Sequence, residues 1–439
     1  MLQASLYTLG CKLNQFETAY MAHVLEDTGY MLVPFPSRAD LYIINTCTVT
    51  AKSDHHSRNA VRKAIRANPE GSVVVTGCAA QVNPDKFAKI PGVSLVIGNR
   101  EKSSITVFLE SLKKGGVVKV RVTEWIEKEI PISPMTICRF MDYTRAFIKV
   151  QEGCDAHCTY CIVPKARGPG RSAAFEDIVK QVQELWGAGY KEIVITGIHL
   201  GQYGNDMRPV RHLYELLESV LPDKGFQRLR LSSIEPNEFT PRLLNIIGNA
   251  SRLCPHYHIP LQSGSGSVLK RMGRQYTPRE YSDLIFRILN KAPLASIGAD
   301  VMAGFPGESE RDFEKTYLLV ERLPLAYLHV FSYSPRPGTP AALLSDQVDS
   351  STKKARSKSL RDLGQRKKDA FRSGFLGKNL EGLVLKQSGP SPGYRVVLTG
   401  NYIPVFVKAG RELVNRTVIV NIQRLTKEGV WGRVVSILN

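Results

Sequence analysis

The chain has 439 residues, enough for about three domains that each bury a core of their own. Apolar residues make up 43% of it, which is ordinary for a folded protein and argues against a disordered chain. Lys and Arg outnumber Asp and Glu by 59 to 40, giving a formal net charge of +19 at pH 7. This excess favours a polyanionic partner, most often nucleic acid, although it can also serve solubility alone.

The chain shows no targeting or membrane segment. No apolar run reaches the roughly 18 residues of a membrane helix, and the N-terminus reads directly into an apolar strand. We therefore expect a cytoplasmic protein with no membrane partner. Because thiols stay reduced in that compartment, the eight cysteines are expected to be available for metal rather than paired as disulfides.

From Ser5 to about Val122, apolar runs alternate with helical stretches, which predicts an N-terminal open parallel α/β sheet. Three of these runs lead directly into a cysteine. The expected strands and cysteines are 5–9 with Cys11, 41–44 with Cys47, and 73–75 with Cys78. Since the carboxyl ends of parallel strands lie along one edge of a sheet, the sequence predicts that the three thiols form one triad. The alternative is that each is an ordinary buried cysteine.

Two prolines, mixed charge and little periodicity predict a linker over residues 124–142. The linker separates an N-terminal domain, residues 1–123, from a second α/β series at residues 143–372. Cys138 in the linker and Cys254 before a later strand are expected to be plain thiols rather than ligands.

The second series contains six strand and helix pairs, which predict a partial TIM-type (β/α)6 barrel. Its active site is expected at the carboxyl ends of the strands. The expected strands are 146–150, 192–196, 228–232, 256–260, 296–301 and 328–332.

A run of three cysteines follows the first of these strands. Cys154, Cys158 and Cys161 supply three thiolates to one small site and no fourth. A zinc site is closed by four ligands, whereas an iron–sulfur cubane held by three cysteines leaves one iron free for a small molecule. His157 offers zinc a fourth ligand, but it would have to reach round a very short loop.

Glycines and polar residues fall at the other predicted strand ends, where they are candidate contacts for a ligand. His199 lies among them, but it reads equally well as a packed loop histidine, because one histidine shows no catalytic geometry. The candidates are Gly197, Ser232, Ser233, Glu235, Gln262, Asp300, Gly304 and the loop that continues to Glu308.

The C-terminal part begins with a strongly basic, helix-compatible stretch from Ser351 to Lys378. It is either a solvated connecting helix or a surface that contacts phosphates. Residues 380–438 alternate polar and apolar positions between glycines, which predicts a small β-barrel within a final domain at residues 373–439. Such barrels often bind RNA, but no base-stacking motif is evident.

The cysteine run, with Tyr160 before its last member, resembles the motif of radical S-adenosylmethionine (SAM) enzymes. Over nearly the whole chain the sequence resembles the methylthiotransferases, and its C-terminal barrel resembles their RNA-binding TRAM module. The signature that includes Asn14 and Glu17 is most similar to the MtaB branch, which acts on N6-threonylcarbamoyladenosine in tRNA. The matching stretches are 10–14, 45–49, 77–81, 154–161, 254–264 and 334–339.

This resemblance implies two 4Fe–4S clusters and SAM as cofactors. One cluster would sit on Cys154, Cys158 and Cys161 and bind SAM through its free iron, with Tyr160 and the strand-end candidates as further SAM contacts. The other would sit on Cys11, Cys47 and Cys78 and hold the sulfur. The implied reaction is methylthiolation of C2 of the modified adenosine at tRNA position 37, next to the anticodon. The implied partners are the tRNA anticodon stem-loop and an electron donor such as flavodoxin or ferredoxin.

Other functions stay open on the sequence. Sister branches act on isopentenyladenosine in tRNA or on an aspartate of a ribosomal protein, and the basic tail disfavours the latter, because that target is itself basic. An alternative of another class is a non-catalytic iron–sulfur or zinc protein that binds RNA through its tail.

Overall fold

The computed structural model describes residues 1–113, 120–124, 132, 135–137, 140, 144–221 and 227–438. It divides into two compact units that do not follow chain order. Unit 1 comprises Met1–Arg139, Lys149–Ala174 and Ser334–Ala342, and unit 2 comprises Phe140–Ile148, Phe175–Tyr333 and Leu343–Asn439. Both predicted cysteine triads therefore belong to unit 1. The predicted domain boundaries stay a prediction, and most of the predicted linker, with Cys138, lies outside the described residues.

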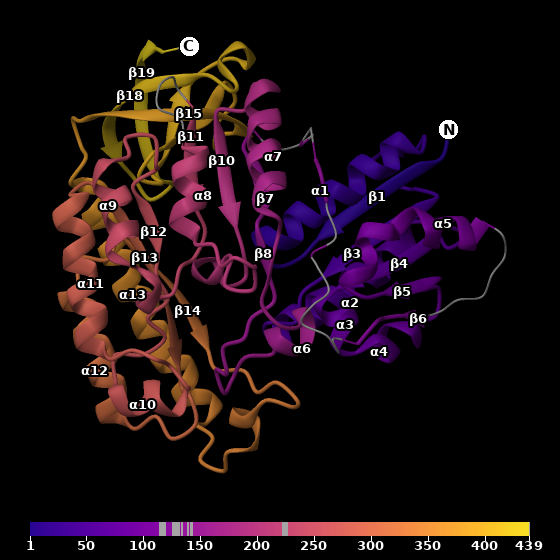
Figure 1. The fold of residues 1–439 in the computed structure, drawn as a ribbon, viewed down its shortest axis with the longest axis horizontal. Helices are drawn as coiled ribbons and strands as arrows, with labels where there is room; N and C mark the ends of the chain where they lie inside the picture. The colour runs from indigo at the N-terminus through magenta and orange to yellow at the C-terminus, as the bar shows by residue number, and fades with distance from the viewer. Residues whose placement is uncertain are drawn as a thin grey trace. The chain divides into compact units, whose positions relative to one another are not determined.

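Unit 1 is built on a six-stranded sheet of order β2-β1-β3-β4-β5-β6, in which every pair of neighbours is parallel (Figure 1). The predicted N-terminal parallel sheet is confirmed. Its strands are β1 (Gln3–Thr8), β2 (Met31–Leu32), β3 (Leu41–Thr46), β4 (Ser72–Gly77), β5 (Leu95–Ile97) and β6 (Val120–Arg121). Its helices are α1 (Lys12–Asp27), α2 (Ala51–Ala67), α3 (Cys78–Val82), α4 (Pro84–Ala88) and α5 (Ile105–Lys113).

Both faces of this sheet are buried, as expected when helices cross over between parallel strands. Successive strand residues point to opposite faces. Ile44 therefore packs with Val61 of α2 in one core cluster, whereas Ile43 packs with Met21 and Leu25 of α1 in the other. Each strand therefore packs into two cores, one on each face of the sheet. For this reason its sequence is a continuous apolar run and does not alternate between apolar and polar residues.

The rest of unit 1 carries the cysteine run. A two-stranded antiparallel ribbon of β8 (Gln151–Glu152) and β9 (Arg171–Ser172) brackets it, and α6 (Val163–Arg167) follows its last cysteine. The run itself forms no helix or strand, so its thiols are presented from a loop.

Unit 2 contains the second α/β series. Its strands form the sheets β11-β10-β7 and β12-β13-β14, and a parallel bridge from Leu229 to Leu253 connects β11 with the chain just before β12. The predicted partial barrel is confirmed. The strands are β7 (Ala146–Lys149), β10 (Glu192–Thr196), β11 (Arg228–Leu231), β12 (His256–His258), β13 (Ser296–Ala303) and β14 (Tyr327–Ser332). The helices are α7 (Phe175–Gly187), α8 (Leu213–Val220), α9 (Pro241–Asn249), α10 (Gly266–Arg271), α11 (Pro278–Lys291) and α12 (Glu310–Arg322).

The basic stretch is helix α13 (Ser350–Ser373), and the predicted small β-barrel after it is confirmed as a closed five-stranded one, drawn in yellow in Figure 1. Buried valines such as Val397 and Val420 fill its centre. Among the described residues, no helix is long and apolar enough to cross a membrane. The barrel strands are β15 (Asn379–Ser388), β16 (Tyr394–Thr399), β17 (Pro404–Lys408), β18 (Thr417–Leu425) and β19 (Val430–Ile437).

Two arginines join the C-terminal barrel to the central strands. Arg228 and Arg230 of β11 both bind the fully buried carboxylate of Glu192 on β10, at 2.8 Å. Arg228 also donates to the carbonyl of Leu398 at 2.8 Å, and Arg230 donates to that of Gly400 at 2.9 Å. The turn after β16 is therefore held against β10 and β11 by a buried, charge-assisted network.

Candidate two-cluster site

Cys11, Cys47 and Cys78 lie where the sequence places them, at the carboxyl ends of three neighbouring strands. Cys11 precedes α1, Cys47 follows β3, and Cys78 begins α3 directly after β4. Gly10, at φ 103°, is required because a Cβ there would lie 3.0 Å from the Sγ of Cys47. Gly77, at φ 96°, is required because a Cβ would lie 2.4 Å from a backbone carbonyl of β3. The sheet edge thus gathers the three thiols only because glycine precedes two of them.

The three thiols influence one another electrostatically. Burial raises the pKa of Cys11, and a negative charge on Cys78 raises it further against the opposing pull of Arg167. Burial likewise raises the pKa of Cys47, with Cys78 and Cys11 adding to it. Three thiolates this close repel each other, and positively charged iron ions bound among them offset the repulsion.

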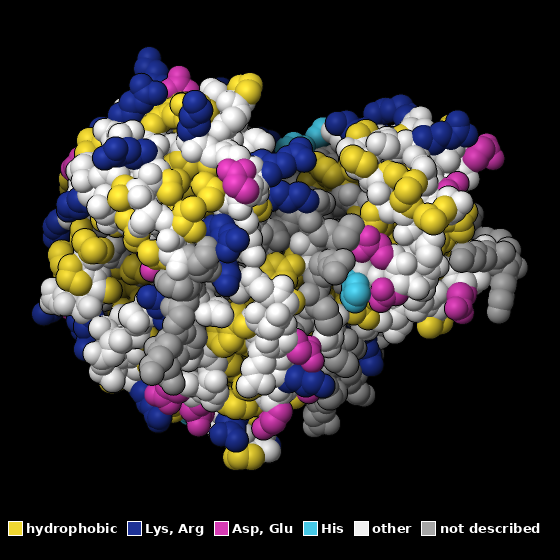
Figure 2. Space-filling view, turned by 90° about the horizontal axis from the view of Figure 1, so that it is seen from above, with side chains coloured by type: hydrophobic (Ala, Val, Ile, Leu, Met, Phe, Trp, Pro, Cys, Tyr) yellow, Lys and Arg dark blue, Asp and Glu magenta, His cyan; other side chains and the backbone are white. Residues whose placement is uncertain are grey.

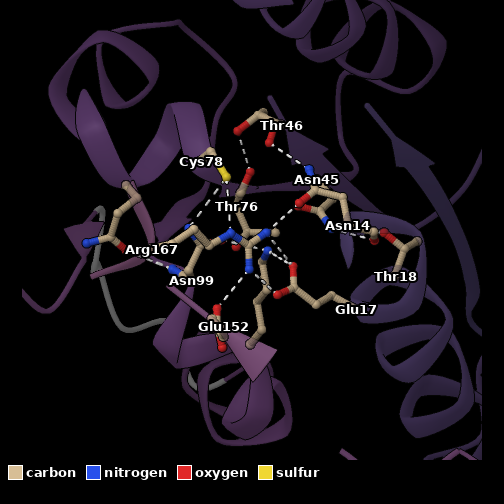
Figure 3. A network of polar contacts seen from close by, with 12 residues as sticks. Asn14, Glu17, Thr18, Asn45, Thr46, Thr76, Cys78, Asn99, Glu152 and Arg167 are labelled. Carbon is tan, nitrogen blue, oxygen red and sulfur yellow. Dashed lines mark hydrogen bonds and ion pairs between the residues drawn. The ribbon is translucent and has the colours of Figure 1, made fainter. Parts of the chain in front are cut away.

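Arg167 is the main cation beside this triad. Its side chain is completely buried, and its Nε donates to the Sγ of Cys78 at 3.3 Å. Its Nη atoms donate to Asn14 at 2.5 Å, to Glu152 at 2.8 Å, and to Glu17 (Figure 3). The guanidinium is thereby held with its edge toward the sulfur of Cys78.

The surroundings of Arg167 carry a positive excess that fits an anionic cluster. Lys102 contacts Glu17, and Lys149 lies 3.0 Å from Glu152. Burial by itself would raise the pKa of Glu17, but the three cations hold it well below its usual range. Arg171, which is also buried, lies 3.9 Å from Glu152, so four buried cations face two carboxylates, and one of the four, Arg167, adjoins Cys78. An uncompensated buried charge is costly, so the donor set fits thiolates that ligate iron.

The second triad lies in the loop between β8 and α6. Its thiols are partly exposed, and backbone N–H groups point at two of them, from Ala156 to Cys154 and from Val163 to Cys161, each at 3.4 Å. Hydrogen bonds to ligating sulfurs are one way in which proteins tune iron–sulfur clusters. A half-buried loop with oriented N–H donors therefore fits a cluster that a small molecule must reach.

The spacing of the thiols argues against the zinc alternative. Among the described residues, no group of three Cys or His ligand atoms that all lie within 4.8 Å of one another includes a cysteine of either triad. The side chain of His157 is exposed. Ligands of one tetrahedral zinc ion would be closer together, because each sulfur lies about 2.3 Å from the metal.

Unit 1 also connects the loops of the two triads through its third segment, Ser334–Ala342. Arg336 donates to the hydroxyl of Thr48, next to Cys47, at 2.7 Å. The N–H of Ala341 donates to the carbonyl of Thr159, in the other triad's loop, at 2.9 Å. This short segment therefore contacts the immediate neighbours of both candidate clusters.

Comparison with known proteins identifies the family of this chain. Residues 3–98 match the model of the Uncharacterized protein family UPF0004, and residues 148–320 match the Radical SAM superfamily. The Threonylcarbamoyladenosine tRNA methylthiotransferase MtaB of Aquifex aeolicus is 41% identical over 92% of this chain and 96% of its own. MtaB of Bacillus subtilis is 38% identical over 99% of this chain and 98% of its own. The chain belongs to the MtaB family of radical SAM methylthiotransferases.

Solved structures support the fold of this MtaB family member. The radical SAM methyltransferase TsrM from Kitasatospora setae aligns with a TM-score of 0.57 at 14% identity, covering 78% of this chain and 77% of TsrM. Membership in the radical SAM family makes the chain an enzyme that uses SAM and iron–sulfur chemistry.

The predicted SAM contacts of this chain are divided between the two units. Tyr160 lies in unit 1 with the cysteine run, and the others lie in unit 2. There the structure brings Gly197 to Ser232, whose hydroxyl accepts from its N–H at 3.4 Å. It also places Gln262 beside Asp300, whose carbonyl accepts from its N–H at 2.8 Å. The role of these residues in binding SAM stays a prediction.

Three other candidates have protein partners in the structure. Glu235 forms an ion pair with Arg274. The N–H of Gly304 donates to the carboxylate of Glu308 at 2.7 Å. His199, which sequence left undecided, is buried with its Nε2 2.6 Å from Glu238. These contacts hold the three residues in place, but they do not show whether the residues bind SAM.

Sequence reasoning named Asp300 but missed its partners. His258 lies 2.9 Å from one carboxylate oxygen of Asp300, and His329 lies 3.3 Å from the same oxygen. Burial would raise the pKa of Asp300, but the two histidines hold it well below its usual range. These side chains come from β13, β12 and β14, so only the sheet register brings them together.

Proposed function

We propose that this protein transfers a methylthio group to C2 of N6-threonylcarbamoyladenosine at position 37 of tRNA. The names of relatives that match almost the whole chain support the substrate. The two separate thiol triads support the chemistry. A side-chain acid or base cannot break an unactivated C–H bond, so the reaction needs a radical that a cofactor generates.

In this proposal Cys154, Cys158 and Cys161 hold the radical SAM cluster, and Cys11, Cys47 and Cys78 hold an auxiliary one. When bound, the first supplies the electron that cleaves SAM to a 5′-deoxyadenosyl radical, and the second holds the sulfur to be methylated by another SAM. An electron donor such as flavodoxin or ferredoxin reduces the first. The tRNA anticodon stem-loop brings the adenine.

The protein's own groups position these centres. The N–H groups of Ala156 and Val163 direct the sulfurs of Cys154 and Cys161. Arg167 donates to the sulfur of Cys78 and fixes it relative to α1 through Glu17. Tyr160, Gly197, Ser232, Glu235, Gln262, Asp300 and Gly304 would orient the SAM molecule.

The observation that carries the proposal is the gathering of Cys11, Cys47 and Cys78 beside a buried arginine that extends from the helix following the other triad. A radical SAM enzyme without a second metal centre has no need of this arrangement. The second triad therefore favours sulfur transfer over the other reactions that start with SAM cleavage.

Nucleoside mass spectrometry tests the substrate. Anaerobically reconstituted enzyme, given SAM, reductant, a sulfur source and tRNA that carries threonylcarbamoyladenosine, should convert that nucleoside to its 2-methylthio form. A parallel reaction with tRNA that carries isopentenyladenosine should give no product. Conversion of the isopentenyl nucleoside instead would move the chain to the sister branch, and conversion of neither would refute the tRNA substrate.

A further inference from the structure

Helix α13 turns one basic face toward a pair of cavities in unit 2. Arg361, Gln365, Lys368 and Arg372 are spaced by four, three and four residues, which places them along one side of the helix. Leu360 and Leu363 of the same helix are buried, and Gly364, which also lines the first cavity, lies against Leu328 of β14. The basic face is therefore held in a defined orientation.

A cavity of about 430 Å³ opens between this face, β14 and the turn before β17, with Tyr327, His329 and Tyr402 in its wall. A second cavity of about 710 Å³ continues toward the loop 425–429 of the C-terminal barrel. The two cavities share Gln365, Lys368, Arg372 and Pro404. We call the two together the α13 groove.

The cations of the α13 groove differ from the other cations of the helix in their partners. Arg356 pairs with Glu308 at 2.9 Å, and Lys358 pairs with Asp362 at 2.7 Å. In the part of the chain that the structure describes, the side chains of Arg361, Lys368 and Arg372 form no salt bridge or hydrogen bond. The groove thus holds three cationic side chains that have no salt-bridge partner among the described residues.

Two cations of the α13 groove are partly removed from solvent. Lys368 and Arg372 are both half-buried, and loss of solvent lowers the pKa of each, although the nearby carboxylate of Asp369 acts in the opposite direction. Lys427 adds a cation in the second cavity, where Asp369 and Glu428 are the only carboxylates. Asp369 accepts from Gln365 at 2.8 Å, which keeps it engaged within the helix. A cation that is partly removed from solvent and has no salt-bridge partner is stabilised when an anion of a bound ligand pairs with it.

The shape and walls of the groove favour a strand of nucleic acid. A row of cations along one wall matches successive phosphates, and the rings of Tyr402 and Phe406 line the other side as apolar surface for sugars or bases. Net charge alone did not locate this face, because Lys and Arg lie at many separate places on the surface shown in Figure 2.

We propose that the α13 groove binds the sugar–phosphate backbone of the RNA substrate, with Lys368 and Arg372 as the central phosphate contacts. This inference rests on the proposed function, since it takes tRNA as the substrate. It assigns a role to the basic stretch, which the sequence reads either as a solvated helix or as a phosphate-contacting surface. The groove adds affinity for the RNA and does not take part in the chemistry.

The test is binding of an unmodified tRNA transcript to the full-length reconstituted protein, measured by fluorescence anisotropy over a series of salt concentrations. The variant is Lys368→Gln/Arg372→Gln. The control is Lys358→Gln/Arg366→Gln, which removes the same charge from exposed positions of α13 outside the groove. Thermal unfolding of both double variants shows whether they still fold. A Lys368→Arg variant, which keeps the positive charge, shows whether charge at this position is sufficient for binding.

We expect the groove variant to bind about tenfold more weakly, with a slope of log K against log salt smaller by about 1.5, as two lost phosphate contacts require. Lys368→Arg and the control should bind like the wild type. Equal losses in groove variant and control would overturn the proposal, as would an unchanged affinity in the groove variant. If the wild type itself binds no tRNA, the proposed function fails and this inference fails with it.

Discussion

Arg167 Nε lies 3.3 Å from Cys78 Sγ, although 89 residues separate them along the chain. The same guanidinium binds Glu17, which lies 150 residues before it on α1. Because Arg167 ends the helix that follows the Cys154 to Cys161 run, it fixes that segment against the sheet edge where the other triad lies. One buried side chain thus connects the two halves of the candidate site.

Replacing Arg167 should destabilise the fold strongly. Arg167→Met leaves the buried carboxylates of Glu17 and Glu152 short of a cation, and breaking a buried pair in this way costs about 3–5 kcal/mol. Chemical denaturation of the apoprotein measures the change. Arg242→Met, in an exposed pair with Glu218, is the control and should change little. Equal losses of unfolding free energy in the two variants would show that the Arg167 network stabilises the fold no more than an exposed ion pair does.

The attachment of the C-terminal barrel should depend on Arg230. Arg230→Met removes a partner of buried Glu192 and a donor to the carbonyl of Gly400. We expect a loss of about 3 kcal/mol or more in the free energy of unfolding, together with faster proteolytic release of the barrel. Arg252→Met, in a partly exposed pair with Glu381, is the matched control. Unchanged proteolysis of Arg230→Met would contradict the role of this network in attachment.

Glu192 makes the same network sensitive to acid. Burial would raise its pKa, but Arg230 and Arg228 hold it well below the usual range. Its contribution to stability is therefore complete above the unfolded pKa of about 4.3, and it is lost as the pH falls toward the folded pKa. The stability difference between wild-type and Glu192→Gln apoprotein should stay constant from neutral pH to about pH 5 and shrink below about pH 4. A difference that grows in acid would contradict this assignment.

Asp300 is the predicted SAM contact with the clearest electrostatic setting. Its carboxylate stays ionised between His258 and His329 and is available to accept hydrogen bonds from ribose hydroxyls. Asp300→Asn should weaken SAM binding about tenfold or more, because a hydrogen bond to a charged group contributes about 1.5–3 kcal/mol. Equilibrium binding to reconstituted enzyme measures this, with exposed Asp283→Asn as the control. Unchanged affinity would limit Asp300 to packing its two histidines.

Much of the architecture follows from local sequence. Strand 192–196 is found as predicted, because its apolar run is bounded by turn residues. The predicted strand 256–260 ends early at His258, because Pro260 has no N–H for a strand ladder. Cys47 and Cys78 could be predicted to meet, since the edge of a parallel sheet is set by strand order alone.

The buried charges could not be assigned in the same way. Arg167, Glu17 and Lys102 come from separate segments, and nothing local to any of them names its partner. A signal was nevertheless present for the barrel, because Arg228 and Arg230 alternate with leucine in a predicted strand. A charge inside a buried strand has to be paired, but only the register identifies Glu192 as its partner.

The central claim is that two triads hold two separate clusters. Iron and acid-labile sulfide are measured per chain in anaerobically reconstituted wild type and in two triple variants, one with Cys11, Cys47 and Cys78 replaced by alanine and one with Cys154, Cys158 and Cys161 replaced. Cys254→Ala, which removes a buried thiol outside both triads, is the control.

We predict two cubanes in the wild type and control, and one in each triple variant. The variant without Cys11, Cys47 and Cys78 should still form 5′-deoxyadenosine from SAM and reductant but no methylthiolated nucleoside, whereas the other variant should form neither. Full iron content in either triple variant, or a wild type that holds a single cubane, would contradict the account.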